Sequence, residues 1–167
     1  MRWKELSEEG CPVARALSVI GDRWTLLILR DCFLGHRRFE RFQQRLGITR
    51  HLLTDRLRKL EEEGVLRREP YQERPLRHEY RLTEKGKALY PTLVSLMTWA
   101  NANVPAKRPP TLTLVGRDSG EPVEPLLVDA RSGQPITHRT VRAVSRPTED
   151  AAEGAAEDAA EDAKGTG

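Results

Sequence analysis

The sequence has few cysteines, few aromatic residues and no long apolar run. Its 167 residues include two cysteines, Cys11 and Cys32, too few for a secreted scaffold held together by disulfides. No stretch of 18 apolar residues occurs, which excludes a transmembrane helix, and the first residues lack the apolar core of a secretory signal. Apolar residues make up 38% and aromatic residues 5%, which predicts a modest core. We therefore expect a soluble, cytoplasmic protein with no membrane association.

Charge is distributed unevenly along the chain. The formal net charge is +3, but residues 148–167 contain seven acids and one base, which leaves residues 1–147 with a net charge of +9. A strongly basic body is typical of proteins that bind polyanions such as nucleic acids. A soluble protein that is merely basic has the same composition. The positions of the basic residues along the chain must therefore distinguish it from a polyanion-binding protein.

Composition divides the chain into three predicted segments. Residues 1–104 show dense helical periodicity, and residues 105–147 are rich in proline, glycine and β-branched residues, which predicts a small β-rich extension. Residues 148–167 contain no large apolar side chain, so burial cannot offset the entropy lost on ordering, and we predict a disordered acidic tail. The short strands expected in the extension cover residues 112–115, 123–128 and 136–144.

Caps and apolar spacing predict the helices of the first segment. Pro12 favours the start of a helix that stops at Gly21, and Asp22 caps a second, almost wholly apolar helix that ends at Gly35. A short helix over residues 39–46 is followed by a Gly-Ile turn and by a fourth helix, which Thr49 caps and which reaches Glu63. A final long helix is expected after Thr83, with a kink at Pro91.

Between the fourth and the last helix the apolar period changes from 3.6 to 2. This change predicts strands over residues 65–69 and 77–82, joined by a polar connection over residues 71–76. The order helix, helix, short helix, turn, helix, strand, strand, helix is that of a winged helix-turn-helix. We therefore predict a mainly α fold with a small β-wing, followed by the β extension and the disordered acidic tail.

In this architecture the fourth helix enters the major groove of DNA, and basic groups on the short helix and the wing contact phosphates. We assign base reading to Arg50, His51, Thr54 and Asp55, near the start of that helix, and phosphate contacts to Arg38, Arg41 and Arg74. The alternative to DNA binding is an ordinary solvated surface. The full set of predicted DNA-binding residues is Arg38, Arg41, Thr49, Arg50, His51, Thr54, Asp55, Arg58, Arg74 and Arg77.

Several motifs together resemble the HxlR-type regulators, a branch of the MarR-like winged-helix transcription factors. They are Cys11-Pro12-Val13-Ala14, the run from Val19 to Arg30, Arg38-Phe39, Gly47-Ile48, Leu53 to Leu57, Leu60 to Val65 and Glu79 to Gly86. The resemblance covers residues 11 to about 104. It implies a homodimeric, double-stranded DNA-binding bacterial regulator, with repression expected ahead of activation. The stripe that is similar to the family's dimerising helix consists of Leu89, Leu93, Leu96, Trp99 and Ala100.

The resemblance also bears on effectors. Some HxlR-type proteins use a cysteine at the place of Cys11 to sense oxidants or electrophiles, and a thiol just before a helix N-terminus has its thiolate favoured by the helix dipole. Cys11 can therefore be a redox sensor or a structural residue without a redox role, and both alternatives stay open. A small-molecule effector that binds in a cleft beside the dimer helices is a further hypothesis. Cys32, inside an apolar helix, is expected to be inert and buried.

The remaining expectations concern metals, cofactors and catalysis. Some relatives carry a ribbon with cysteines where this chain has Ser119, Asp129 and Ser132, so we expect a metal-free extension. The sequence contains no Ser-His-Asp order, phosphate-binding glycine loop or HExxH motif, and we expect neither a cofactor nor an enzyme. The alternative function is a winged-helix protein-interaction module that does not bind DNA.

Overall fold

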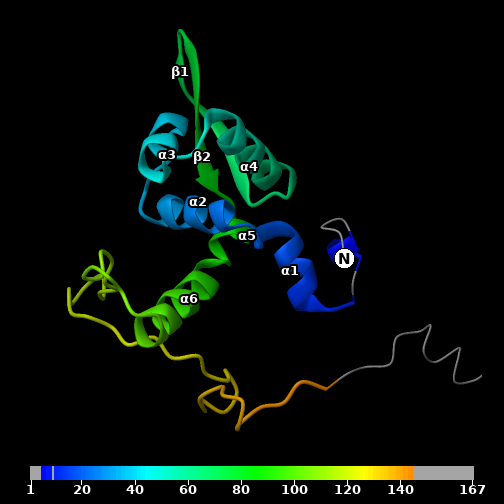
Figure 1. Ribbon diagram of the computed structural model, residues 1–167, viewed down its shortest axis with the longest axis vertical. Coiled ribbons are helices and arrows are strands. Elements are labelled where there is room, and N and C mark those ends of the chain that lie inside the picture. Colours follow the sequence, from blue (N-terminus) through cyan, green and yellow to red (C-terminus); the bar gives the residue numbers. More distant parts are fainter. Residues whose placement is uncertain (1–4, 9, 145–167) are drawn as a thin grey trace, which may run out of the picture. The chain divides into compact units, whose positions relative to one another are not determined.

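The computed structural model describes residues 5–8 and 10–144. The acidic tail predicted for residues 148–167 lies outside the described residues. The chain divides into two compact units, Met1–Pro125 and Leu126–Gly167, and the first holds the helices and strands (Figure 1). These elements are η1 (Glu5–Ser7), α1 (Pro12–Ile20), α2 (Arg23–Phe33), α3 (Phe39–Leu46), α4 (Arg50–Glu62), β1 (Leu66–Glu73), β2 (Leu76–Leu82), α5 (Glu84–Lys87) and α6 (Tyr90–Asn103).

The fold is a winged helix-turn-helix, as predicted, and α1 to α4 begin at the predicted residues, with side-chain caps at Asp22 and Thr49. The Asp22 carboxylate accepts hydrogen bonds from the backbone N–H groups of Trp24 and Thr25, at 2.9 and 3.2 Å. Gly47 ends α3 with φ +62°, a conformation that glycine adopts without strain, and Thr49 then caps α4. The turn between α3 and α4 is therefore fixed by local chemistry.

The hydrophobic core lies where α2 meets α3, α4 and the first residues of β1. In Figure 1 α2 lies beneath α3 and α4, and the two-stranded hairpin projects away from it between these two helices. Burial of their apolar sides in this core holds α2, α3 and α4 at fixed angles to one another. The buried apolar residues are Ile20, Ile28, Leu29, Phe42, Ile48, Leu53, Leu57, Leu60, Val65 and Leu66.

The wing is an antiparallel hairpin that is longer than predicted. Pairing runs from Leu66 with Leu82 to Glu73 with Leu76, so the predicted polar connection shrinks to a two-residue turn, Arg74-Pro75. Apolar alternation underestimates the length of these strands, because an exposed hairpin pairs its backbone without needing an apolar face. Pro70 pairs with His78 and Gln72 pairs with Arg77, which leaves Tyr71 as the extra residue of a β-bulge.

The predicted single long helix after Thr83 is two helices, α5 and α6, and the predicted kink at Pro91 is wrong. Pro91 lies in the first turn of α6, where its missing N–H costs nothing, so it starts a helix instead of bending one. At Gly86 a Cβ atom would collide with the Val65 carbonyl oxygen, so glycine lets α5 dock on the wing base. No helix in residues 5–8 and 10–144 is long and apolar enough to cross a membrane.

The prediction of three strands in the extension is also wrong, because the described part of the extension contains only two isolated bridges. Val115 bridges Pro122 within the first unit, and Val128 bridges Pro135 within the second. Both flank tight turns that end at glycines with φ +69°, Gly120 and Gly133. Each bridge has a proline as one partner, and proline has no N–H with which to continue a ladder.

Candidate nucleic-acid interface

A buried ion triad fixes α3 against α2. The Asp31 side chain, on α2, is fully buried and accepts hydrogen bonds from Arg30 Nη2 at 2.8 Å and from Arg45 Nε at 2.9 Å. Because Arg45 lies on α3, this contact joins the two helices. This contact could not be predicted from the sequence, because nothing in the local pattern shows a partner for an acid inside an apolar helix.

The exposed side of α4 carries the residues predicted to read bases. Three of the four leucines of α4, Leu53, Leu57 and Leu60, are buried in the core, and the opposite side of the helix faces solvent. There His51 Nε2 lies 3.4 Å from an Asp55 carboxylate oxygen, and Arg58 Nη2 lies 3.6 Å from the other. The His51 side chain is 90% exposed. The Asp55 carboxylate is therefore held between two basic groups at the surface.

The two threonines at the start of α4 are partly engaged by the backbone. Thr49 Oγ1 accepts from the Leu52 N–H, so its own hydroxyl proton remains available for donation to an anion. Thr54 Oγ1 donates to the Arg50 carbonyl at 2.9 Å, so its oxygen retains lone pairs that can accept from a base amino group. Both residues keep a hydrogen-bonding capability that suits the predicted contact.

A cleft of about 1000 Å³ opens between the start of α3, the start of α4 and the wing. Two acids line it, Glu40 and Glu79, and the side chain of Glu79 is mostly buried beneath two arginines. The excess of positive charge makes this cleft complementary to a polyanion. The six arginines that line it are Arg37, Arg38, Arg41, Arg50, Arg68 and Arg77.

Two arginines of the cleft rest on aromatic rings. The Arg38 guanidinium lies 4.3 Å from the ring centre of Tyr71, the bulged residue of β1, and the Arg50 guanidinium lies 4.9 Å from the Phe39 ring centre. A ring fixes the orientation of an arginine but leaves its N–H donors free. In the part of the chain that the structure describes, neither Arg38 nor Arg50 forms an ion pair with a carboxylate.

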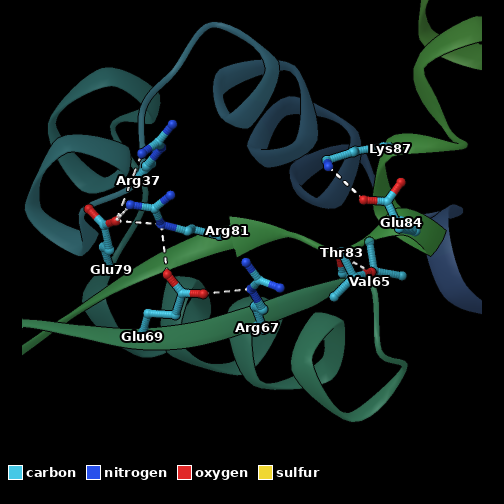
Figure 2. A network of polar contacts seen from close by, with 9 residues as sticks. All are labelled: Arg37, Val65, Arg67, Glu69, Glu79, Arg81, Thr83, Glu84 and Lys87. Carbon is cyan, nitrogen blue, oxygen red and sulfur yellow. Dashed lines mark hydrogen bonds and ion pairs between the residues drawn. The ribbon is translucent and has the colours of Figure 1, made fainter.

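Two acids of the wing, Glu69 and Glu79, are paired with arginines at the wing base. Figure 2 shows Glu79 between Arg37 and Arg81, and Glu69 between Arg81 and Arg67. Arg81 lies 2.6 Å from Glu79 and 2.8 Å from Glu69, and Arg67 lies 2.7 Å from Glu69. Three arginines thus balance two glutamates, and the wing base keeps a positive excess.

The structure brings four of the predicted DNA-binding residues into one cleft: Arg38, Arg41, Arg50 and Arg77. Arg74 lies outside it, at the exposed turn of the wing. The other predicted residues follow the exposed side of α4 next to the cleft. Tyr71 was not predicted as part of the site; Pro70 before it, a break in strand pattern, was the only signal of the bulge that places it there.

The predicted dimerisation stripe has two different environments. Leu89 and Leu93 pack against the core, whereas Leu96 and Trp99 are 46% and 60% exposed, and Ala100, which follows Trp99, is half-buried. Exposed leucine and tryptophan on one helix indicate an apolar contact surface. Its dimerising role stays a prediction. Val13 and Leu17 on α1 are also exposed.

The two cysteines lie in different environments. Cys11 is exposed at the N-cap of α1, where its side chain makes no capping hydrogen bond. Cys32 is largely buried on α2, and burial together with the charge of Asp31 raises the pKa of its thiol to about 12. Cys11 is the more exposed of the two thiols, and the raised pKa of Cys32 disfavours its reactive thiolate form.

The geometry agrees with comparisons to known proteins. Residues 19–108 match the family model of the HxlR-like helix-turn-helix. The uncharacterized HTH-type transcriptional regulator Rv3095 of Mycobacterium tuberculosis is 46% identical over 133 residues, which are 80% of this chain and 84% of that protein.

Two solved structures extend the comparison. The candidate transcription factor PA1607 superposes with a TM-score of 0.76 at 45% identity, covering 85% of this chain and 99% of its own. The redox regulator HypR in its reduced form gives 0.53 at 36% identity, covering 56% of this chain and 93% of its own. Since the family model spans more than half of the sequence, this chain belongs to the HxlR-like helix-turn-helix family and is a transcriptional regulator with a helix-turn-helix DNA-binding domain.

Proposed function

We propose that the chain acts as a homodimer that binds a specific double-stranded DNA operator and represses transcription. The observation that carries the proposal is the arginine-lined cleft beside the exposed start of α4. Phosphates of one strand lie in the cleft, and the N-terminal half of α4 enters the adjacent major groove. In this proposal residues 1–104 supply DNA binding and dimerisation.

Residues in the interface divide by role. Arg38, Arg41 and Arg77 hold phosphates in the cleft, and Arg74 reaches the backbone or the minor groove from the wing turn. Arg50, His51 and Thr54 read base edges from the start of α4. Asp55 accepts from a cytosine amino group, a contact that its two basic neighbours make tolerable near phosphates. Thr49 and Arg58 contact flanking phosphates.

The exposed apolar side chains of α1 and α6 support the proposed dimer. Leu96 and Trp99 on α6, with Val13 and Leu17 on α1, are more exposed than apolar residues of a stable monomer need be. A twofold dimer that buries them presents two α4 helices to one face of DNA. The two half-sites are then about 34 Å apart, one helical turn. Occupation of such an operator at a promoter excludes polymerase, which gives repression.

This function is tested by selection from sheared genomic DNA of the source organism, with the oligomeric state of the same preparation measured by sedimentation. We expect a dimer that enriches a short, inverted-repeat motif, with an affinity that falls steeply as salt rises. A monomer, or a protein without salt-dependent DNA binding, contradicts the proposal; the second outcome favours a protein-interaction module.

Regulation by oxidants is proposed for Cys11. The cysteine is exposed at a helix start, and the similar HypR is described as a redox regulator. We expect an oxidant such as hydrogen peroxide to weaken operator binding of the wild-type chain by tenfold or more, and we expect Cys11→Ser to abolish this response. Cys32→Ser, at the buried thiol, is the matched control and keeps the response. Equal sensitivity of the wild type and Cys11→Ser excludes the sensor.

A further inference from the structure

A second cavity, of about 280 Å³, lies at the base of the wing beside α2 and α5. It shares Arg37 and Tyr80 with the large cleft, but its other lining residues are its own. Within residues 5–8 and 10–144 no acid lines it, and its four cationic side chains outnumber the three glutamates that pair with them, which makes the cavity complementary to an anion. The lining residues are Cys32, Arg37, Arg67, Tyr80, Arg81, Leu82 and Lys87.

The cationic side chains of this cavity already form ion pairs with glutamates. These ion pairs do not use all the N–H donors of the cations. Figure 2 shows Arg37, Arg81, Arg67 and Lys87 with their glutamates. Arg67 makes its contact with Glu69 through Nε, and Arg37 has only a long contact of 3.9 Å with Glu79. A guanidinium has five N–H donors and an ammonium has three, so several remain for a ligand.

The remaining lining residues are uncharged. They are Cys32, Tyr80 and Leu82, and burial together with the charge of Asp31 raises the pKa of the Cys32 thiol to about 12, so the thiol stays protonated. Uncharged residues beside cationic groups suit a ligand with one anionic end and one apolar end. The volume equals that of about nine water molecules at roughly 30 Å³ each, which sets the size of the ligand.

We propose that this cavity binds a small organic oxyanion, with its carboxylate or phosphate group held by Arg67, Arg81 and Lys87. Arginine matches such groups because its planar fork donates two parallel hydrogen bonds. The short apolar part of the ligand then lies against Leu82 and Cys32.

Binding at this cavity is coupled to the large cleft, a step that rests on the proposed DNA-binding function. Glu79 lines the cleft, whereas its partners Arg37 and Arg81 line the small cavity. A bound anion competes with Glu79 for these guanidiniums, so the Glu79 carboxylate loses part of its neutralisation and repels DNA phosphates. The backbone is also shared, since the Tyr80 N–H donates to the Arg37 carbonyl at 2.7 Å. The ligand therefore weakens DNA binding.

The site is tested first on the full chain without DNA. Hexanoate and inorganic phosphate are titrated separately at constant ionic strength, and the side-chain Nε–H resonances of arginine are followed by NMR. We expect saturable shifts with hexanoate, and at least tenfold weaker binding in the double variant Arg67→Gln, Lys87→Gln. Arg117→Gln, which removes an exposed charge outside the cavity, is the control and binds as the wild type does.

Melting curves show whether the double variant is folded. The single variants Arg67→Gln and Lys87→Gln are each expected to lose an intermediate part of the hexanoate affinity, which supports the site independently of the double variant. Shifts that do not saturate, or that the double variant reproduces, overturn the site. Saturable binding of phosphate without hexanoate overturns the apolar half of the assignment.

The coupling is tested by operator binding at saturating hexanoate and constant ionic strength. We expect the affinity of the wild type to fall by about fivefold or more, within the range of typical allosteric couplings, and that of the double variant to stay unchanged. A saturable NMR response without an effect on DNA affinity refutes the coupling but leaves the site standing. Absence of DNA binding refutes the proposed function alone.

Discussion

Asp31→Ala is expected to lower the free energy of unfolding by about 3 kcal/mol. The Asp31 carboxylate is fully buried between Arg30 and Arg45, and removal of one partner from a buried ion pair typically costs about 3 to 5 kcal/mol. We expect the lower end of that range because both arginine side chains are 35% exposed and can turn toward water. Urea unfolding measures the loss as a lower midpoint at an unchanged slope.

Glu62→Ala is the matched control, because Glu62 is an exposed acid whose contact with Arg58 spans 3.8 Å. Its removal is expected to change stability by no more than about 0.5 kcal/mol. Arg45→Met keeps an unbranched apolar stem but removes the guanidinium and so breaks the same α2–α3 contact; its effect and that of Asp31→Ala are therefore expected to be less than additive. Equal midpoints for Asp31→Ala and Glu62→Ala would show that the triad contributes nothing to stability.

Most of the fold could be predicted from the sequence because its signals are local. Asp22 and Thr49 cap the helices that follow them, and Gly47 supplies the positive φ of the turn, so each boundary is decided within about four residues. The leucines of α4 repeat at helical spacing and therefore showed which side of that helix is buried. The same reasoning placed Pro91 inside a helix and was wrong, since proline is as favourable at a helix start as it is harmful in the interior.

The site was only partly predictable because it forms from contacts between distant segments. The arginines near α3 and at the wing could be listed from the sequence, but their meeting in one cleft depends on the length of β1 and on the bulge at Tyr71. The role of Asp31 likewise depends on Arg45, a residue of another helix. Neither the register of an exposed hairpin nor a partner across helices is encoded by apolar spacing.

Arg50→Ala and Arg74→Ala are expected to weaken DNA binding in different ways. Arg50, fixed over Phe39 at the start of α4, is proposed to read a base, so its loss should weaken operator binding by roughly 5- to 150-fold, the equivalent of about 1 to 3 kcal/mol, and change binding to random DNA less. Arg74, at the exposed wing turn, is proposed to contact phosphate, so its loss should weaken binding to both DNAs alike and reduce the salt slope by about 0.9.

Both variants are compared with Arg117→Ala, which removes the same charge from an exposed turn outside the cleft. This control is needed because any lost positive charge weakens DNA binding through the general field of the protein, and only losses beyond that of Arg117→Ala report contacts. Fluorescence anisotropy on operator and random duplexes over a series of salt concentrations gives both the affinity ratio and the slope. If Arg50→Ala lowers binding to the two duplexes equally, Arg50 is a phosphate contact, and base reading must fall to residues further along the exposed side of α4.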